Sequence, residues 1–344
     1  MTVGVGVIGT GMIGQDHIRR ITEVLTGGAV VAVNDVDADR AGQVAAGLRR
    51  ADLPSATVHE TAKDLVTDPR VDAVLVASWG AAHEEQVTAS IEAGKPVFCE
   101  KPLAPAQDAC LRIIGAETAR GRRYVQVGFM RRYDAGYQAM KAALAGGAIG
   151  APLLMHCAHR NPSVPPYGFT TEMAITDSAV HEIDVVRWLF DEEIAAASVL
   201  TPRRTSRAAE GVQDPLILVL EMASGVLVDD EVFVNAGYGY DIRGEVVGEH
   251  GTVALAGGGD VTLTAGGRRS RNVPASWQER FVRAYDAELQ AWLDAVARDT
   301  VTGPSAWDGY AAAAVTDAAV RALRTGQRTP ISLSERPGLY AKAS

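Results

Sequence analysis

Asp177 and His181 are the two residues of this sequence best placed for acid–base chemistry. They lie four residues apart in a segment, residues 176–189, whose apolar side chains recur near helical spacing, so both should project from one helix face. A carboxylate that orients an imidazole and stabilises its protonated form makes that imidazole a general base. An ordinary ion pair on a helix surface has the same spacing. The rest of the chain must therefore decide between a catalytic base and a surface pair.

Lys101 is a second candidate for chemistry. It follows the apolar run 96–99, which predicts a buried strand, and Pro102 restricts the backbone beside it. A lysine held in this way can donate a hydrogen bond to a substrate oxygen on which negative charge builds. A flexible surface lysine is the alternative. Together with a nicotinamide site, Lys101 would complete the chemistry that Asp177 and His181 indicate.

A glycine-rich turn at residues 9–14 indicates a dinucleotide site. It follows the β-rich run 3–8 directly and precedes a helical pattern. Gly9 permits the tight turn, Gly11 leaves room for a pyrophosphate, and Gly14 lets the helix pack closely on the strand. The helix N-terminus would then face the phosphates.

Polar residues follow three of the predicted strands. Residues 29–34 form the second strand, and Asp35 comes after it at about the twenty-residue spacing from the turn where a carboxylate binds ribose hydroxyls. A carboxylate there would repel a 2′-phosphate, so we predict NAD rather than NADP. Ser78, Trp79 and Glu100 end two later strands, and the Trp79 ring could line the nicotinamide or cap the core. The predicted cofactor-binding residues are Gly9, Gly11, Met12, Ile13, Gly14, Asp35, Ser78, Trp79, Glu100 and Lys101.

Strands and helices alternate through residue 128, which predicts a doubly wound parallel sheet, the Rossmann arrangement. Consecutive strands separated by short turns follow from residue 194, which predicts an open, mainly antiparallel sheet in an α+β domain. The expected fold class is therefore α/β with an added α+β domain. We expect an NAD-binding domain at 1–128 and a substrate-binding and oligomerisation domain at 129–344, whose last helices, 277–298 and 306–324, could pack back on the first.

Polar residues also alternate in the second half. His159 and Asn161 should share one side of a strand, and so should Tyr238 and Tyr240. Such a row is often only the wet side of a sheet. If it faces the nicotinamide end of the first domain instead, it offers hydrogen bonds to a polyhydroxylated substrate.

Composition limits the remaining possibilities. A chain of 344 residues with 47% hydrophobic and 22% charged residues can bury two domain cores. A net charge of −9 argues against a nucleic-acid partner, and no apolar run or leader suggests a membrane, so we expect a cytoplasmic protein. Three scattered cysteines fit neither a disulfide framework nor zinc, and His181 lacks the second histidine of a zinc-peptidase helix. We therefore predict no bound metal.

Several segments together resemble a known family, the Gfo/Idh/MocA oxidoreductases. Residues 159–162 and 238–241 are similar to its inositol dehydrogenase branch in particular. The resemblance extends over residues 9–14, 100–103, 130–134, 156–162, 177–188, 237–241, 277–292 and 303–310.

The resemblance implies a reaction and a set of site residues. Members of the branch oxidise myo-inositol at its axial hydroxyl to 2-keto-myo-inositol with NAD, and they are frequently homotetramers. By motif position, the catalytic residues would be Lys101, Asp177 and His181, and the residues near the polyol would be those three with Arg131, His159, Asn161 and Tyr240. The loop 162–171 is expected to border the substrate.

Three other functions remain open at this point. The same chemistry could act on another inositol isomer or an aldose, since residue spacing does not separate these substrates. An NAD-dependent glycosidase and a non-catalytic dinucleotide sensor are less favoured. All three catalytic candidates are present in the chain, which favours an enzyme over a sensor.

Overall fold

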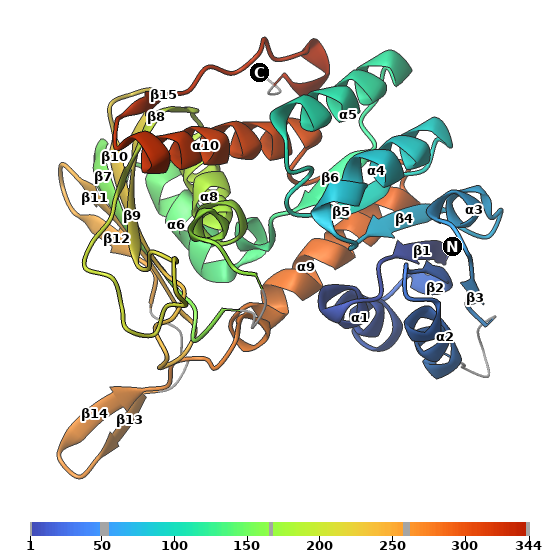
Figure 1. Ribbon diagram of the computed structural model, residues 1–344, viewed down its shortest axis with the longest axis horizontal. Helices are drawn as coiled ribbons and strands as arrows, with labels where there is room; N and C mark the ends of the chain where they lie inside the picture. Colours follow the sequence, from blue (N-terminus) through green and yellow to red (C-terminus); the bar gives the residue numbers. More distant parts are fainter. Residues whose placement is uncertain (1, 49–54, 165–167, 257–261, 342–344) are drawn as a thin grey trace. The chain divides into compact units, whose positions relative to one another are not determined.

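The computed structural model describes residues 2–48, 55–164, 168–256 and 262–341 (Figure 1). The chain divides into two compact units, each of which is built from more than one stretch of chain. The first unit consists of Met1–Phe129, Tyr285–Ala313 and Ser334–Ser344. The second consists of Met130–Ala284 and Ala314–Leu333. The first unit thus takes residues from the C-terminal part of the chain as well as the whole N-terminal sheet.

The first unit is built on a six-stranded parallel sheet in the order β3-β2-β1-β4-β5-β6. Its central strands are rich in Val and fully buried, as expected of strands that are covered on both faces. The strand order reverses between β1 and β4, so a ligand crevice is expected beyond their carboxyl ends. The strands are β1 (Val3–Ile8), β2 (Gly28–Asn34), β3 (Thr57–Val58), β4 (Ala73–Val76), β5 (Val97–Glu100) and β6 (Val125–Gly128).

Helices of the first unit connect these strands. Two of them, α4 and α5, pack together on one face of the sheet (Figure 1). The helices in chain order are α1 (Met12–Arg19), α2 (Ala38–Gly47), α3 (Ala62–Thr67), α4 (His83–Glu92) and α5 (Gln107–Arg120), with π-helical residues Arg20–Val24 after α1 and a 3₁₀ turn Gly80–Ala82 before α4.

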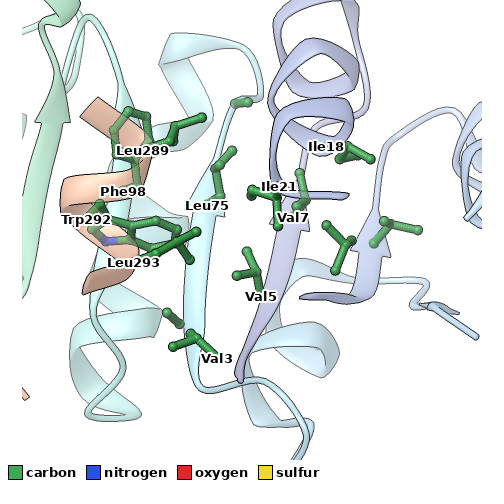
Figure 2. Packing of buried hydrophobic residues seen from close by; sticks show 14 of the residues in the cluster. Val3, Val5, Val7, Ile18, Ile21, Leu75, Phe98, Leu289, Trp292 and Leu293 are labelled. Carbon is green, nitrogen blue, oxygen red and sulfur yellow. The ribbon is translucent and has the colours of Figure 1, made fainter. Parts of the chain in front are cut away.

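Helix α9 (Trp277–Ala297) supplies part of the first unit's core (Figure 2). Leu289 and Trp292 of this helix are buried in one apolar cluster with Phe98 of β5 and Ile18 of α1. The rings of Phe98 and Trp292 meet edge to face at 5.7 Å between centroids. The cluster fixes the positions of α1, which begins at the candidate cofactor site, and of β5, which ends there.

The second unit is built on a seven-stranded sheet in the order β12-β11-β7-β10-β9-β8-β15. All its pairings are antiparallel except the parallel pair β7 and β10. Helices α6 (Ala135–Ala145) and α8 (Val180–Phe190) lie on one side of it (Figure 1). The strands are β7 (Pro152–Arg160), β8 (Ile194–Leu200), β9 (Leu216–Met222), β10 (Leu227–Phe233), β11 (Asp241–Gly248), β12 (Thr252–Ala254) and β15 (Thr329–Pro330), and β13 (Thr262–Ala265) and β14 (Arg268–Arg271) form a separate hairpin.

The two sheets confirm the expected fold class, a Rossmann sheet followed by a mixed, mainly antiparallel one. Helix α10 (Ala306–Thr325) agrees closely with its predicted range. In α9 the backbone leaves helical geometry at Phe281. The strands β14 and β15 were not predicted, because β14 is a charged run without alternation and β15 spans only two residues.

Two local predictions were wrong. The segment containing Asp177 is not regular α-helix: Ala174–Ala179 is π-helical, and α8 begins only at Val180. Isolated π turns occur often at functional sites. Tyr238 and Tyr240 do not share a strand face either, because Gly237 and Gly239 adopt positive φ values and β11 starts after them. Tyr238 is half exposed, whereas Tyr240 is buried.

No helix in the described ranges is both long and apolar enough to cross a membrane.

Candidate active site

The glycine turn between β1 and α1 has the geometry of a dinucleotide cradle. Gly9 has a φ of +92°, and a Cβ there would lie 2.5 Å from the backbone nitrogen of Ser78. A Cβ on Gly14 would clash with the Gly9 carbonyl oxygen, so this position keeps α1 close to β1. At Gly11, by contrast, a Cβ would have no described atom within 4 Å. Gly11 thus leaves space at the start of α1, and the residues fit a bound pyrophosphate.

The two residues between these glycines at the start of α1 have different surroundings. Met12 is largely exposed, and Ile13 packs partly against the apolar core of the unit. Ile13 therefore anchors the first turn of the helix, while Met12 stays beside the space that Gly11 leaves.

Asp35 follows β2 and is held by a dense set of donors. Its Oδ2 accepts hydrogen bonds from the backbone N–H and the hydroxyl of Thr10, at 2.6 and 2.9 Å. Its Oδ1 accepts from the Asp37 backbone N–H at 3.0 Å and from Nη2 of Arg40 at 2.6 Å. Burial alone would raise the pKa of Asp35, but Arg40 and the other donors outweigh burial and lower the pKa to about 2. Asp35 is thus an anion over the whole physiological range.

The loop after β4 is tied to the loop after β5 by a buried histidine. Nδ1 of His83 lies 2.8 Å from the Pro102 carbonyl oxygen, and its Nε2 lies 3.0 Å from the Ser78 carbonyl oxygen. Burial lowers the pKa of His83, so the ring is neutral and donates to one of these carbonyls at a time. Ser78, in the loop after β4, donates its hydroxyl to Gln86 of α4 at 2.6 Å. Trp79 is 83% exposed, which excludes the alternative that its ring caps the core.

Lys101 is held by its preceding residue. Glu100, at the end of β5, accepts a hydrogen bond from the Lys101 backbone N–H at 3.1 Å. The other carboxylate oxygen of Glu100 lies 2.7 Å from Nε2 of His17, a fully buried residue of α1. Helix α1 is therefore connected through one carboxylate to the backbone that presents Lys101.

His159 is the centre of the second unit's candidate residues. Its Nε2 lies 3.2 Å from Oδ1 of Asn161, and its Nδ1 lies 2.9 Å from Glu182. The ring meets Tyr240 edge to face at 5.7 Å and lies 6.3 Å from the His181 ring, both measured between centroids. The sequence-predicted residues His159, Asn161, Tyr240 and His181 are thus brought together.

Arg131 contacts this cluster and is almost completely buried. Its guanidinium, 1% exposed, forms an ion pair with the fully buried Glu182 and lies 3.1 Å from Nδ1 of His159. Burial would lower the pKa of Arg131 and raise that of Glu182. Their mutual attraction reverses both shifts, so the pKa of Arg131 is raised and that of Glu182 is lowered. The phenyl ring of Phe281 lies 5.6 Å from the same guanidinium. Arg131 is therefore placed to support His159.

Asp177 and His181 come from the π-helical turn and the first turn of α8. Asp177 is exposed, whereas His181 is 8% exposed and lies on the side of the His159 cluster. Asn161 donates to the Ser178 hydroxyl at 3.4 Å, which connects β7 to this turn. The orientation of His181 by Asp177 stays a prediction. In the loop 162–171, residues 165–167 lie outside the described residues.

Sequence reasoning missed the residues that support the site. Thr10 and Arg40 hydrogen-bond Asp35. His17 contacts the Glu100 carboxylate and His83 contacts the Pro102 carbonyl, on either side of Lys101. Glu182 pairs with Arg131. The only available signal was for Glu182, a carboxylate within an apolar helix, which predicts a buried partner. The described residues contain no group of three or more His, Cys, Asp or Glu side chains placed to hold a metal ion.

The topology and the glycine turn place the chain in the class of dinucleotide-binding Rossmann proteins. Residues 3–129 match the oxidoreductase family profile described as an NAD-binding Rossmann fold, and residues 141–333 match the profile of its C-terminal alpha/beta domain. The chain belongs to the Gfo/Idh/MocA oxidoreductase family, which confirms the resemblance seen in the sequence. It is an NAD-dependent oxidoreductase.

Similar proteins cover nearly the whole chain. Inositol 2-dehydrogenase 3 of Saccharopolyspora erythraea is 56% identical over 340 residues, 99% of this chain and 98% of the relative. Inositol 2-dehydrogenase of Burkholderia multivorans is 52% identical over 340 residues, 99% of each chain. The structure of myo-inositol dehydrogenase from Lactobacillus casei, in complex with NAD(H) and myo-inositol, matches with a TM-score of 0.95 at 40% identity, covering 99% of this chain and all of that one.

Proposed function

We propose that this protein oxidises myo-inositol at its axial hydroxyl to 2-keto-myo-inositol, with NAD as the hydride acceptor. The observation that carries the proposal is the full-length similarity to inositol 2-dehydrogenases at 56% and 52% identity. The cluster around His159 is consistent with it, because imidazole, amide and phenol groups can hydrogen-bond a ring of hydroxyls.

An alcohol carbon loses hydride readily only as its hydroxyl proton is removed, and a hydroxyl is too weak an acid to ionise unaided. The proposed residues therefore have to remove that proton. His181 takes the hydroxyl proton, and Asp177 orients the ring and offsets its new charge. Lys101 hydrogen-bonds the same substrate oxygen as negative charge builds on it. Bound NAD supplies the acceptor for the hydride. The backbone ties of Glu100 and His83 keep Lys101 positioned before substrate arrives.

The residues around the polyol are proposed in two roles. His159, Asn161 and Tyr240 contact the substrate hydroxyls. Arg131 acts through His159, since its guanidinium is buried against Glu182. If the roles are divided in this way, substitution of Asn161 should change KM without destabilising the protein. Substitution of Arg131 should change KM and also lower the stability of the fold.

A substrate panel tests the proposal. Inositol isomers and aldoses are assayed for formation of NADH and NADPH by absorbance. The highest kcat/KM is expected for myo-inositol with NAD. A higher kcat/KM for another isomer or an aldose moves the assignment to that substrate, and no NADH formation with any free polyol contradicts the proposed reaction.

Two variants test the assigned groups. His181→Gln and Lys101→Met should each lower kcat by about a hundred-fold or more, the usual contribution of a general base or an oxyanion donor. NAD affinity, measured by calorimetry, should remain nearly unchanged. His250→Gln is the matched control, because this histidine is exposed in the turn between β11 and β12. Near-normal turnover in His181→Gln would remove His181 as the base.

The family resemblance further supports a homotetramer in the cytoplasm, assembled through the open sheet of the second unit. One side of that sheet carries ion pairs between neighbouring strands, such as His156 with Asp229 and Arg160 with Glu231. Size-exclusion chromatography with light scattering measures the assembly, and a monomer at micromolar concentration would contradict the proposed tetramer.

A further inference from the structure

The strongest unassigned feature is the arginine that sits on the candidate ribose-binding carboxylate. Nη2 of Arg40 donates to Oδ1 of Asp35 at 2.6 Å, and Nε approaches Oδ2 at 3.4 Å. The Asp35 side chain is only 4% exposed in this arrangement, whereas the Arg40 side chain is 38% exposed. The guanidinium is therefore the more exposed partner in a pair whose carboxylate is almost fully covered.

The donors on Asp35 differ in how easily they can leave. Thr10 is fully buried and donates from its backbone and its hydroxyl, and the Asp37 donor is a backbone N–H. These three bonds are fixed by the fold. Arg40 reaches Asp35 through a long, partly exposed side chain from the first turn of α2. A carboxylate has about four acceptor positions, and the three fixed donors leave one of them, so a ribose hydroxyl can bind Asp35 only where Arg40 withdraws.

We propose that Arg40 is a displaceable counter-ion that sets the preference between NAD and NADP. This rests on the proposed role of Asp35 as the ribose ligand. Arg40 competes with the ribose hydroxyls of NAD for Asp35. With NADP it remains beside Asp35 and pairs with the 2′-phosphate, offsetting the repulsion of the carboxylate. Arg40 thus lowers the affinity for NAD and raises that for NADP, so it narrows the discrimination that Asp35 provides.

The proposal predicts opposite changes for two small probes. ADP carries the free ribose diol and 2′,5′-ADP carries the 2′-phosphate, and calorimetry measures both without turnover. In Arg40→Gln, ADP should bind about three-fold tighter or more, because a competing charge-assisted bond is lost. Binding of 2′,5′-ADP should weaken by about ten-fold or more, because an arginine–phosphate pair is lost. The kcat/KM ratio for NAD over NADP should rise accordingly.

Two further variants keep the outcomes distinct. Arg112→Gln breaks a comparable exposed pair with Glu84 on helices α4 and α5, and it should leave both affinities unchanged. Asp35→Asn tests the underlying assumption, since it must weaken ADP binding if Asp35 holds the ribose. If Asp35→Asn leaves ADP binding unaltered, the ribose role fails. If Asp35→Asn weakens ADP but Arg40→Gln weakens both probes equally, or changes neither, the counter-ion role of Arg40 is overturned.

Discussion

The buried pair of Arg131 and Glu182 gives the sharpest stability prediction. Neither side chain is more than 1% exposed, and the Glu182 carboxylate pairs with Arg131 and lies 2.9 Å from Nδ1 of His159. Glu182→Ala leaves a buried guanidinium without its counter-charge and removes a partner of the imidazole. Breaking one side of a buried ion pair costs about 3–5 kcal/mol. We expect the free energy of unfolding to fall by that amount, measured by urea titration of the apo protein.

The effect should depend on pH in a defined direction. Burial alone would raise the pKa of Glu182, but Arg131 and His159 lower it below its ordinary value. Because the folded-state pKa is depressed, the stabilisation is complete above the ordinary glutamate pKa. The stabilisation is lost as pH falls through the pKa that Glu182 has in the folded state. The difference between wild type and Glu182→Ala should therefore shrink toward acid pH.

Two control variants distinguish the loss of a buried ion pair from the loss of a carboxylate in general. Glu221→Ala removes the partner of Arg328 from an exposed pair on the same sheet, and it should cost less than about 1 kcal/mol. The double variant Arg131→Met with Glu182→Leu should lose less than the sum of the two single variants, because no uncompensated charge remains. A Glu182→Ala cost as small as that of Glu221→Ala would refute this reasoning.

Three further predictions concern the first unit. Gly11→Ala should weaken NAD binding measured by calorimetry while the melting temperature of the apo protein stays nearly unchanged, because a Cβ there meets no described atom within 4 Å. Gly14→Ala should lower the apo melting temperature as well, because its Cβ would clash with the Gly9 carbonyl, and an unchanged melting temperature would contradict that close approach. His83→Ala should lower the free energy of unfolding, measured by urea titration, by about 2–4 kcal/mol. It should also lower kcat while KM changes little, because the loop that carries Lys101 loses its contact with His83. A raised KM with an unchanged kcat would argue against that role.

The sequence by itself determined those features that are local in the chain. The alternation of strands and helices through residue 128 predicted the parallel sheet, because each element there has its own hydrophobic period. The turn at 9–14 was predictable because the glycine spacing is a sequence-local requirement of a dinucleotide site. The ribose-binding role of Asp35 stays a prediction. The resemblance to the family added Arg131 to the residues expected near the polyol, because the alternation of polar residues had already indicated His159, Asn161 and Tyr240.

Other features depended on contacts between residues far apart in the sequence. The π-helical turn holding Asp177 could not be predicted, because it has the same residue pattern as an α-helix. Arg131 gave no sign of burial, since only the folding of β7 and α8 around it brings Glu182 and His159 to its guanidinium.

The contacts that position the backbone at Lys101 also required the tertiary structure. His17 and His83 lie on separate helices and reach Glu100 and Pro102 only because α1 and α4 pack against the same sheet. The residue pattern within a segment specifies which helix or strand forms. The partners of a buried charged side chain depend instead on which helices and strands pack together in the core.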